Sequence, residues 1–136
     1  MHSGKRIIDH SCAVGGPFAG QLLAQLGAEV IKVEALDGDY ARRVPPLLDS
    51  GESPFFLSVN RGKQSIALDL KSPEGKQALN DLVRESDAVI YGFAPSVPQR
   101  LGLDFETLSQ INPRIVVGQI IGLHDKDEWA AAPAFD

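Results

Sequence analysis

The stretch GGPFAGQLLAQLGAEVIKVE, residues 15–34, contains the residue types that could bind a phosphate. Gly15 and Gly16 allow a close approach of the backbone, and the helical pattern that follows would direct its free N–H groups at an anion. Glu34 ends the next apolar run, where a dinucleotide-binding fold places the acid that contacts a ribose. The stretch therefore predicts a site for a phosphate-bearing cofactor.

The spacing of the glycines disfavours a dinucleotide as the cofactor. The dinucleotide fingerprint G-x-G-x-x-G spaces its glycines differently, because here they fall at positions 15, 16 and 20, and Pro17 interrupts the variable positions. Two interpretations stay open. The stretch is either a phosphate-binding turn of another kind, or a tight turn without a ligand in which Glu34 is a solvated strand end.

Four basic residues, Arg42, Arg43, Arg61 and Lys63, lie in or beside residues 35–64, which are rich in turn-forming residues. Long irregular connections in compact domains are usually functional or mobile. Guanidinium and ammonium groups make charge-assisted hydrogen bonds to phosphates, so these side chains favour a polyphosphate site near the turn. The alternative is that each is an ordinary solvated charge.

Two further groups contain reactive residue types. His10 and Cys12 could form a nucleophile and its base, but no third group that would orient them is evident, so we interpret them as packing residues. His124, Asp125 and Asp127 could bind a metal, yet a structural zinc site needs four ligands that include thiolates or several histidines. We therefore expect a solvated loop there and no metal.

Hydrophobic periodicity predicts the elements that would position these residues. Apolar runs predict strands at 6–10, 28–34, 65–70, 87–93 and 114–121, and helical spacing predicts helices at 17–26, 72–86 and 103–111. This alternation predicts an α/β fold with a Rossmann-like parallel sheet, helices on both faces, and ligands beyond the carboxyl ends of the strands. In the first helix we expect Phe18, Ala19, Leu22, Leu23 and Leu26 on the buried face and Gln21 and Gln25 on the other.

Length and composition favour one globular domain over residues 1–136, with 43% hydrophobic residues. A net charge of −5 argues against nucleic acid or an anionic membrane as partner, since both need clustered basic residues. No apolar run approaches the roughly 20 residues that cross a bilayer. The single cysteine excludes an internal disulfide framework, so we expect a cytoplasmic protein.

Several motifs, read in order, resemble one protein family. They are GPFAGQLLAQLGAEVIKVE, GDYARR, FFLSVNRGKQSIALDLKSPEGKQAL, SDAVIYGFAPSVPQRLGLDFETLSQINPRIV and PAFD. The series is similar to the family III CoA-transferases, a group that includes formyl-CoA and carnitine CoA-transferases and α-methylacyl-CoA racemases. The resemblance implies the N-terminal portion of a Rossmann-like large domain, coenzyme A bound as an acyl-CoA substrate, a carboxylic acid as the other substrate, and a homodimer in the full-length form. Apolar surface around Trp129 and Phe135 is expected to favour association.

The resemblance also implies which residues contact CoA. The family's contact positions correspond here to Val14, Gly15, Leu68, Asp69, Leu70, Lys71, Gly92, Phe93, Ala94 and Arg100. Lys71 and Arg100 would pair with phosphates, and the backbone at Val14 and Gly15 would line the nucleotide. A common family pattern reads ENFRPG where this chain has YGFAPS, so the chain departs from it at Gly92, Ala94 and Ser96. Ala35 replaces an arginine of some members.

The resemblance leaves the catalytic residue unassigned. In the family, the aspartate that accepts the acyl group lies beyond the position of Asp136, and Phe135 occupies the position of the histidine base of the racemases. Phenylalanine cannot transfer a proton. Two hypotheses follow. The chain is the CoA-binding portion of a CoA-transferase or acyl-CoA racemase, or it is a non-catalytic binding or interaction module of the same fold, which the departures at Ala35, Gly92 and Ala94 favour.

Overall fold

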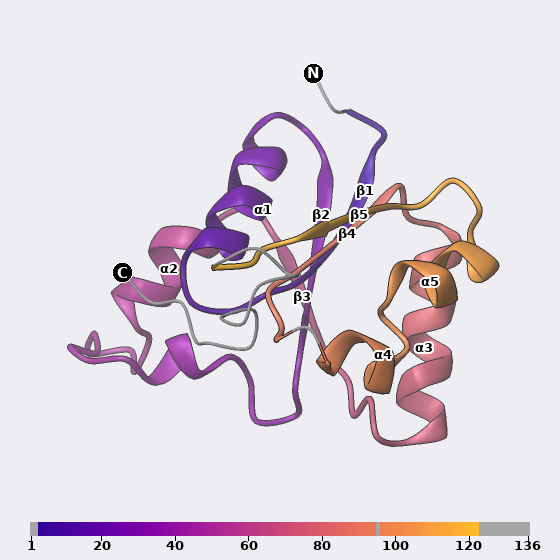
Figure 1. The fold of residues 1–136 in the computed structure, drawn as a ribbon. Helices are drawn as coiled ribbons and strands as arrows, with labels where there is room; N and C mark the ends of the chain where they lie inside the picture. Colours follow the sequence, from indigo (N-terminus) through magenta and orange to yellow (C-terminus); the bar gives the residue numbers. More distant parts are fainter. Residues whose placement is uncertain (1–2, 95, 123–136) are drawn as a thin grey trace.

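Five parallel strands form the centre of the structure, a computed structural model that describes residues 3–94 and 96–122 (Figure 1). The strands are β1 (Arg6–His10), β2 (Glu29–Glu34), β3 (Gln64–Ala67), β4 (Ala88–Tyr91) and β5 (Val116–Gln119), and their order in the sheet is β3-β2-β1-β4-β5. The chain builds from β1 to one edge and then returns to build the other half. The strand order therefore reverses between β1 and β4, and the predicted Rossmann-like α/β fold is confirmed.

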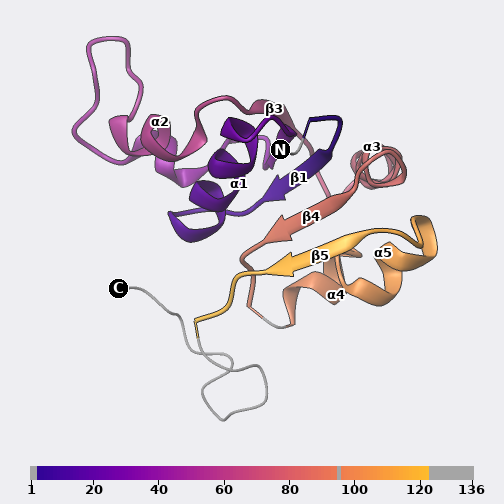
Figure 2. The ribbon, with the colours of Figure 1, turned by 90° about the horizontal axis from the view of Figure 1, so that it is seen from above.

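Helices cover both faces of this sheet (Figures 1 and 2). On one face lie α1 (Gly15–Gln25) and α2 (Pro54–Asn60), and on the other lie α3 (Pro73–Arg84), α4 (Val97–Leu101) and α5 (Phe105–Ile111). Successive strand residues point to opposite faces. Ile8 and Val89 accordingly join the larger core with residues of α3 and α5, whereas Ile7 and Val30 pack against α1.

The connection between β2 and β3 contains more structure than the sequence predicts. The predicted irregular segment holds a 3₁₀ helix, η1 (Tyr40–Arg43), as well as α2, which has Pro54 in its first turn and buries Phe56 and Val59. Seven residues are too few for hydrophobic periodicity to distinguish a helix from a loop. The short helix α4 is likewise not predicted by the sequence.

Capping residues fix several helix ends. Ser72 Oγ accepts a hydrogen bond from the Gly75 N–H at 3.0 Å at the start of α3, and Asp104 accepts one from the Thr107 N–H at 2.9 Å at the start of α5. α1 ends before Gly27, whose φ of 97° is the left-handed conformation expected after a helix. Local capping chemistry therefore sets three of the boundaries that the sequence predicts.

The predicted orientation of α1 is wrong for four residues, although Leu23 packs against the core and Gln25 is exposed as predicted. Phe18, Leu22 and Leu26 are 43–51% exposed, whereas Gln21 is only 2% exposed and accepts a hydrogen bond from the Arg61 N–H at 2.9 Å. Small residues face the sheet instead, because the helix lies so close that a Cβ at position 20 would be 2.7 Å from Asp9 Oδ2. The close approach to β1 therefore overrides the hydrophobic stripe.

Candidate functional site

The turn between β1 and α1 leaves the start of the helix without a side-chain cap. Val14 is the N-cap residue and makes no side-chain hydrogen bond to the first turn. Ser11, which could have capped the helix, instead donates its hydroxyl and its N–H to the Asp9 carboxylate. Ala13 has a φ of 63°, an uncommon conformation for a residue with a side chain. The helix N-terminus is thus available to an anion.

Val14 and Gly15 lie beside Gly92–Ala94, because β1 and β4 are neighbours and both segments follow their carboxyl ends. Ile120, just after β5, joins the two segments. A Cβ at position 15 would lie 3.6 Å from Ile120 Cγ2, and one at position 92 would lie 3.7 Å from Ile120 Cβ. The structure therefore brings these predicted residues together where the strand order reverses, the usual ligand position in such sheets. The sequence argument missed Ile120.

The predicted contacts Leu68 to Lys71 follow β3, which β2 separates from β1. Leu70 is only 8% exposed and belongs to the core with α3 and α5, and Leu68 packs against the same core. Asp69 accepts a hydrogen bond from the Lys71 N–H at 2.9 Å, and both residues are exposed. The Leu70 side chain is therefore committed to packing, so only its backbone is available to a ligand.

The side chain of Phe93 is packed, whereas that of Arg100 is exposed. The Phe93 ring packs edge-on against His10, with ring centroids 4.9 Å apart, and stacks on Tyr91 at 6.0 Å. Arg100 is exposed in the last turn of α4, and Ala94 is exposed in the segment after β4. The Phe93 ring is therefore fixed by packing, while the exposed guanidinium of Arg100 is accessible to an anion.

Three of the four basic residues from which we predicted a polyphosphate site are paired within the fold, and for the buried Lys63 and the bidentate Arg42 this contradicts the prediction. Lys63 Nζ lies 2.6 Å from Asp9 Oδ2, and Arg42 donates to both oxygens of Glu34 at 2.7 and 2.6 Å. Arg43 pairs with Asp37 at 3.5 Å on the surface. Their charges are therefore compensated within the fold. Arg61, Lys71 and Arg100 form no ion pair with another described residue.

Glu34 is not available to a ribose. Besides Arg42, its carboxylate accepts hydrogen bonds from Ser65 Oγ at 2.5 Å and from the Asp39 N–H at 2.8 Å. Burial alone would raise the pKa of Glu34, but the hydrogen bonds from Arg42, Ser65 and Asp39 outweigh it and lower the pKa to about 2. Glu34 therefore holds the loop after β2 in place, which removes the main support for a dinucleotide site.

His10 and Cys12 do not form a reactive pair. Burial and the nearby Lys32 lower the pKa of His10 to about 4, and its buried Nδ1 has no hydrogen-bond partner among the described residues. Burial and the carboxylate of Asp39 raise the pKa of the Cys12 thiol, which disfavours the nucleophilic thiolate. The interpretation as a packing residue agrees with this geometry for His10, which packs on Phe93, but not for Cys12, which is exposed.

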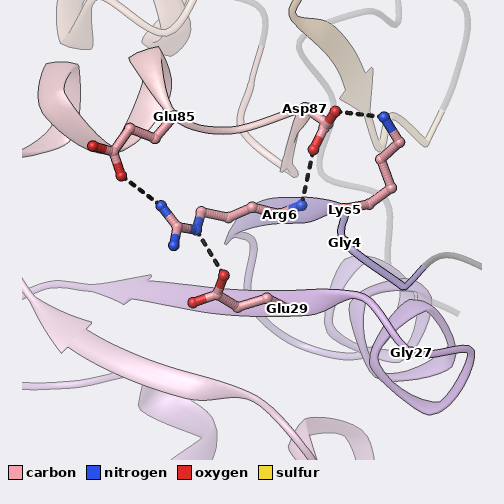
Figure 3. A pocket seen from close by; sticks show the side chains of 7 residues that line it. All are labelled: Gly4, Lys5, Arg6, Gly27, Glu29, Glu85 and Asp87. Atoms are coloured by element: carbon pink, nitrogen blue, oxygen red, sulfur yellow. Dashed lines mark hydrogen bonds and ion pairs between the residues drawn. The ribbon is translucent and has the colours of Figure 1, made fainter.

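A hollow of about 520 Å³ lies at the opposite edge of the sheet, beside the amino ends of β1 and β2 (Figure 3). Its charges are mutually compensated, because Arg6 contacts Glu29 at 2.7 Å and Glu85 at 2.6 Å, and Lys5 contacts Asp87 at 2.7 Å. None of the residues predicted to bind CoA lines it. This hollow is therefore separate from the candidate site.

Within residues 3–94 and 96–122, no cluster of three His, Cys, Asp or Glu side chains could hold a metal ion. Over the same part of the chain, no helix has the length and hydropathy needed to cross a bilayer. His124, Asp125, Asp127, Trp129, Phe135 and Asp136 lie outside the described residues.

Replacing Glu34 with Gln tests its role in the loop. A folded-state pKa of about 2, below the ordinary 4.5, means that the ionised carboxylate stabilises the fold above pH 4.5 and that this contribution disappears as the pH falls toward 2. We expect Glu34→Gln to be less stable than the parent at neutral pH, with a difference that shrinks over this range in urea unfolding. The exposed Asp49→Asn variant is the control. A Glu34→Gln difference independent of pH would contradict the assignment.

Comparison with known proteins identifies relatives along the chain. Residues 3–136 match the model of CoA-transferase family III. A succinate–glutarate CoA-transferase of Agrobacterium fabrum is 38% identical, over 98% of this chain and 35% of its own length. A formyl-CoA:oxalate CoA-transferase of Streptomyces coelicolor is 41% identical, over 88% of this chain and 29% of its own length. The chain thus spans about a third of the length of these relatives.

Solved structures give the same result. A CAIB/BAIF family protein from Brucella suis has a TM-score of 0.92 and 34% identity, and the match covers 98% of this chain and 36% of that one. A hypothetical protein from Mycobacterium tuberculosis has a TM-score of 0.89 and 36% identity, with the same coverage of 98% and 36%. Fold and sequence agree over nearly the whole chain, which therefore belongs to CoA-transferase family III.

Proposed function

We propose that residues 1–136 form the CoA-binding Rossmann-like domain of a family III CoA-transferase, and that the whole protein moves CoA between carboxylic acids. The match to the family over residues 3–136 carries this proposal. The relatives named above, a succinate–glutarate and a formyl-CoA:oxalate CoA-transferase, support acyl-CoA and a carboxylic acid as the substrates. The uncapped start of α1 supports a phosphate-bearing ligand at this edge.

The proposed CoA site contains backbone donors and two exposed cations. CoA phosphates would lie over residues 14–17, where the start of α1 presents N–H groups and its positive dipole end. Lys71, which follows β3, and Arg100, in α4, would donate charge-assisted hydrogen bonds to the CoA phosphates. The remaining proposed contacts are Leu68, Asp69, Leu70, Gly92, Phe93 and Ala94, with Leu70 acting through its backbone. Gly92 and Ala94 replace polar family residues, so part of the affinity must come from the backbone.

The catalytic step is the less defined part of the proposal. The resemblance implies that an aspartate accepts the acyl group as a covalent intermediate, and a racemase remains the alternative reaction. The carboxylates of Asp9 in β1 and Glu34 in β2 do not support such a role, because both are buried in ion pairs, with Lys63 and Arg42 respectively. A non-catalytic binding or interaction module is the second candidate function, favoured by Ala35, Gly92 and Ala94.

We also propose that the whole protein is a cytoplasmic homodimer, as the resemblance implies. An apolar stripe on α1 supports an interface, since Phe18, Leu22 and Leu26 are 43–51% exposed on a helix that carries no charged residue. Light scattering of the whole protein should give the mass of two chains. The mass of one chain at high concentration would contradict this proposal.

Titration calorimetry with acetyl-CoA tests the binding site. We expect Lys71→Ala and Arg100→Ala each to weaken affinity about two- to fivefold, because an exposed ion pair contributes at most about 1 kcal/mol. Lys76→Ala and Arg114→Ala are matched controls, since both residues are exposed and lie away from the turn. Unchanged affinity in both test variants would remove Lys71 and Arg100 from the site, and absent binding to the parent would reject the CoA proposal.

A turnover assay separates binding from catalysis. The protein is incubated with several acyl-CoA thioesters and a panel of carboxylic acids, and CoA exchange and α-deuterium incorporation are followed. For the 136-residue chain we expect binding without turnover, because Asp9 and Glu34 are compensated by buried partners. Turnover that survives Asp136→Asn would show that a nucleophile elsewhere within the 136 residues has been overlooked.

A further inference from the structure

The ammonium group of Lys63 is fully satisfied inside the protein. Lys63 Nζ donates to Asp9 Oδ2 at 2.6 Å, to the Pro17 carbonyl at 2.7 Å and to Asn60 Oδ1 at 2.7 Å. A lysine has three N–H donors, so none remains for a ligand. The side chains of Lys63 and Asp9 are 2% and 0% exposed. Lys63 therefore joins the end of β1, the first turn of α1 and the end of α2.

The partner of Lys63 organises the turn that leads into α1. Asp9 Oδ1 accepts the Ser11 N–H at 3.1 Å and the Ser11 hydroxyl, while Asp9 Oδ2 accepts from Lys63. Ser11 is thereby held against the strand instead of capping the helix. The turn and its cation are separated by 54 residues in sequence, so the contact ties two distant segments together.

A second buried pair holds the same turn from the other side. Lys32 Nζ donates to the Ser11 carbonyl at 2.7 Å and lies 2.9 Å from Asp39 Oδ2, an ion pair without hydrogen-bond geometry. Both side chains are 2% exposed. The backbone at Ser11 therefore contacts Asp9 through its N–H and Lys32 through its carbonyl. Two lysine–aspartate pairs thus lie directly beneath the turn.

Two buried ion pairs fix the geometry of the turn more than they stabilise the fold. Burying two ion pairs brings little net stability, because desolvation offsets the attraction between the charges. What the pairs do supply is geometry. Ala13 keeps its uncommon φ of 63° only because the surroundings hold it, and a Cβ at position 20 would lie 3.2 Å from Lys63 Cε. The ion pairs therefore fix the distance between α1, β1 and the turn that joins them.

We propose that Lys63 is a positioning residue for the CoA-binding turn, acting through Asp9 and the Pro17 carbonyl without touching the ligand. This inference rests on the proposed function, because the turn is the proposed phosphate site. It replaces the earlier prediction that Lys63 binds phosphate. With Lys63 in place, the N–H groups of residues 14–16 are arranged before CoA arrives, so binding does not have to order them.

Cys12 provides a reporter of the turn itself. It is the single cysteine of the sequence, it is exposed, and it lies between Ser11 and Ala13. Besides burial, the nearby Asp9 carboxylate contributes to the raised pKa of Cys12, so the alkylation rate with iodoacetamide is compared between variants after correction for the thiol pKa measured in each. The corrected rate reports on the order of the turn without any ligand. Acetyl-CoA, whose thiol is blocked, is used for affinity so that the ligand does not consume the reagent. Turn order and CoA binding are thus measured separately.

The test compares Lys63→Met with Asp9→Asn/Lys63→Met in the purified protein. The double variant avoids leaving a buried carboxylate without a cation, which would favour unfolding. In the double variant we expect Cys12 to be alkylated about fivefold faster than in the parent protein, because the turn opens locally. We expect acetyl-CoA affinity about tenfold weaker, because binding must then order the turn.

Two controls separate positioning from general effects. Val83→Ala lowers stability in the core on the opposite face of the sheet, and Lys76→Met removes one exposed lysine charge. We expect neither control to change the Cys12 alkylation rate or the acetyl-CoA affinity as much as the double variant does. The proposal is overturned if the double variant leaves both readouts unchanged, if Val83→Ala at equal stability changes both equally, or if neither Lys63 variant folds. Absent acetyl-CoA binding with faster alkylation would reject the CoA proposal and keep the positioning role.

Discussion

Asp9 places a charge in the centre of a parallel sheet, and much of the surrounding structure follows from the need to neutralise it. The carboxylate is fully buried on β1, so it requires a cation and hydrogen-bond donors. Lys63 supplies the cation and brings the end of the β2–β3 connection, with α2, against α1. α1 must then lie close to the strand, which a side chain at position 20 would prevent.

Local patterns are sufficient for most of the fold, because each strand is a short apolar run such as RIIDH at 6–10 and the longest helix, α3, has clear caps. They fail for the face of α1. Phe18 and Leu22 are more hydrophobic than the buried residues of the helix, which are Gly16, Pro17, Gly20 and Gln21, so a pattern argument buries them. Contacts decide otherwise, since a Cβ at position 16 would lie 2.3 Å from the Ser11 side chain. That crowding exists only in three dimensions.

The candidate site is predictable in the same partial way. The proximity of Gly15 and Gly92 follows from the strand order of a doubly wound sheet, without knowledge of any side chain. The pairing of Lys63 does not, because its partner lies 54 residues earlier. A basic residue in an irregular segment therefore resembles a phosphate ligand until the buried acid is found. The acid inside the apolar run IIDH, Asp9, was the signal that could have revealed it.

The segment between η1 and α2 is closed at its base. Ser53 Oγ donates to the Val44 carbonyl at 2.7 Å, and residues 45–52 beyond this contact are exposed. Because the two ends are already held together, each doubling of the loop's length would cost only about 0.6 kcal/mol of closure entropy. Insertions and deletions here would leave the lysine and aspartate beneath the turn undisturbed. Changes in the length of this outer loop are therefore compatible with an unchanged candidate site.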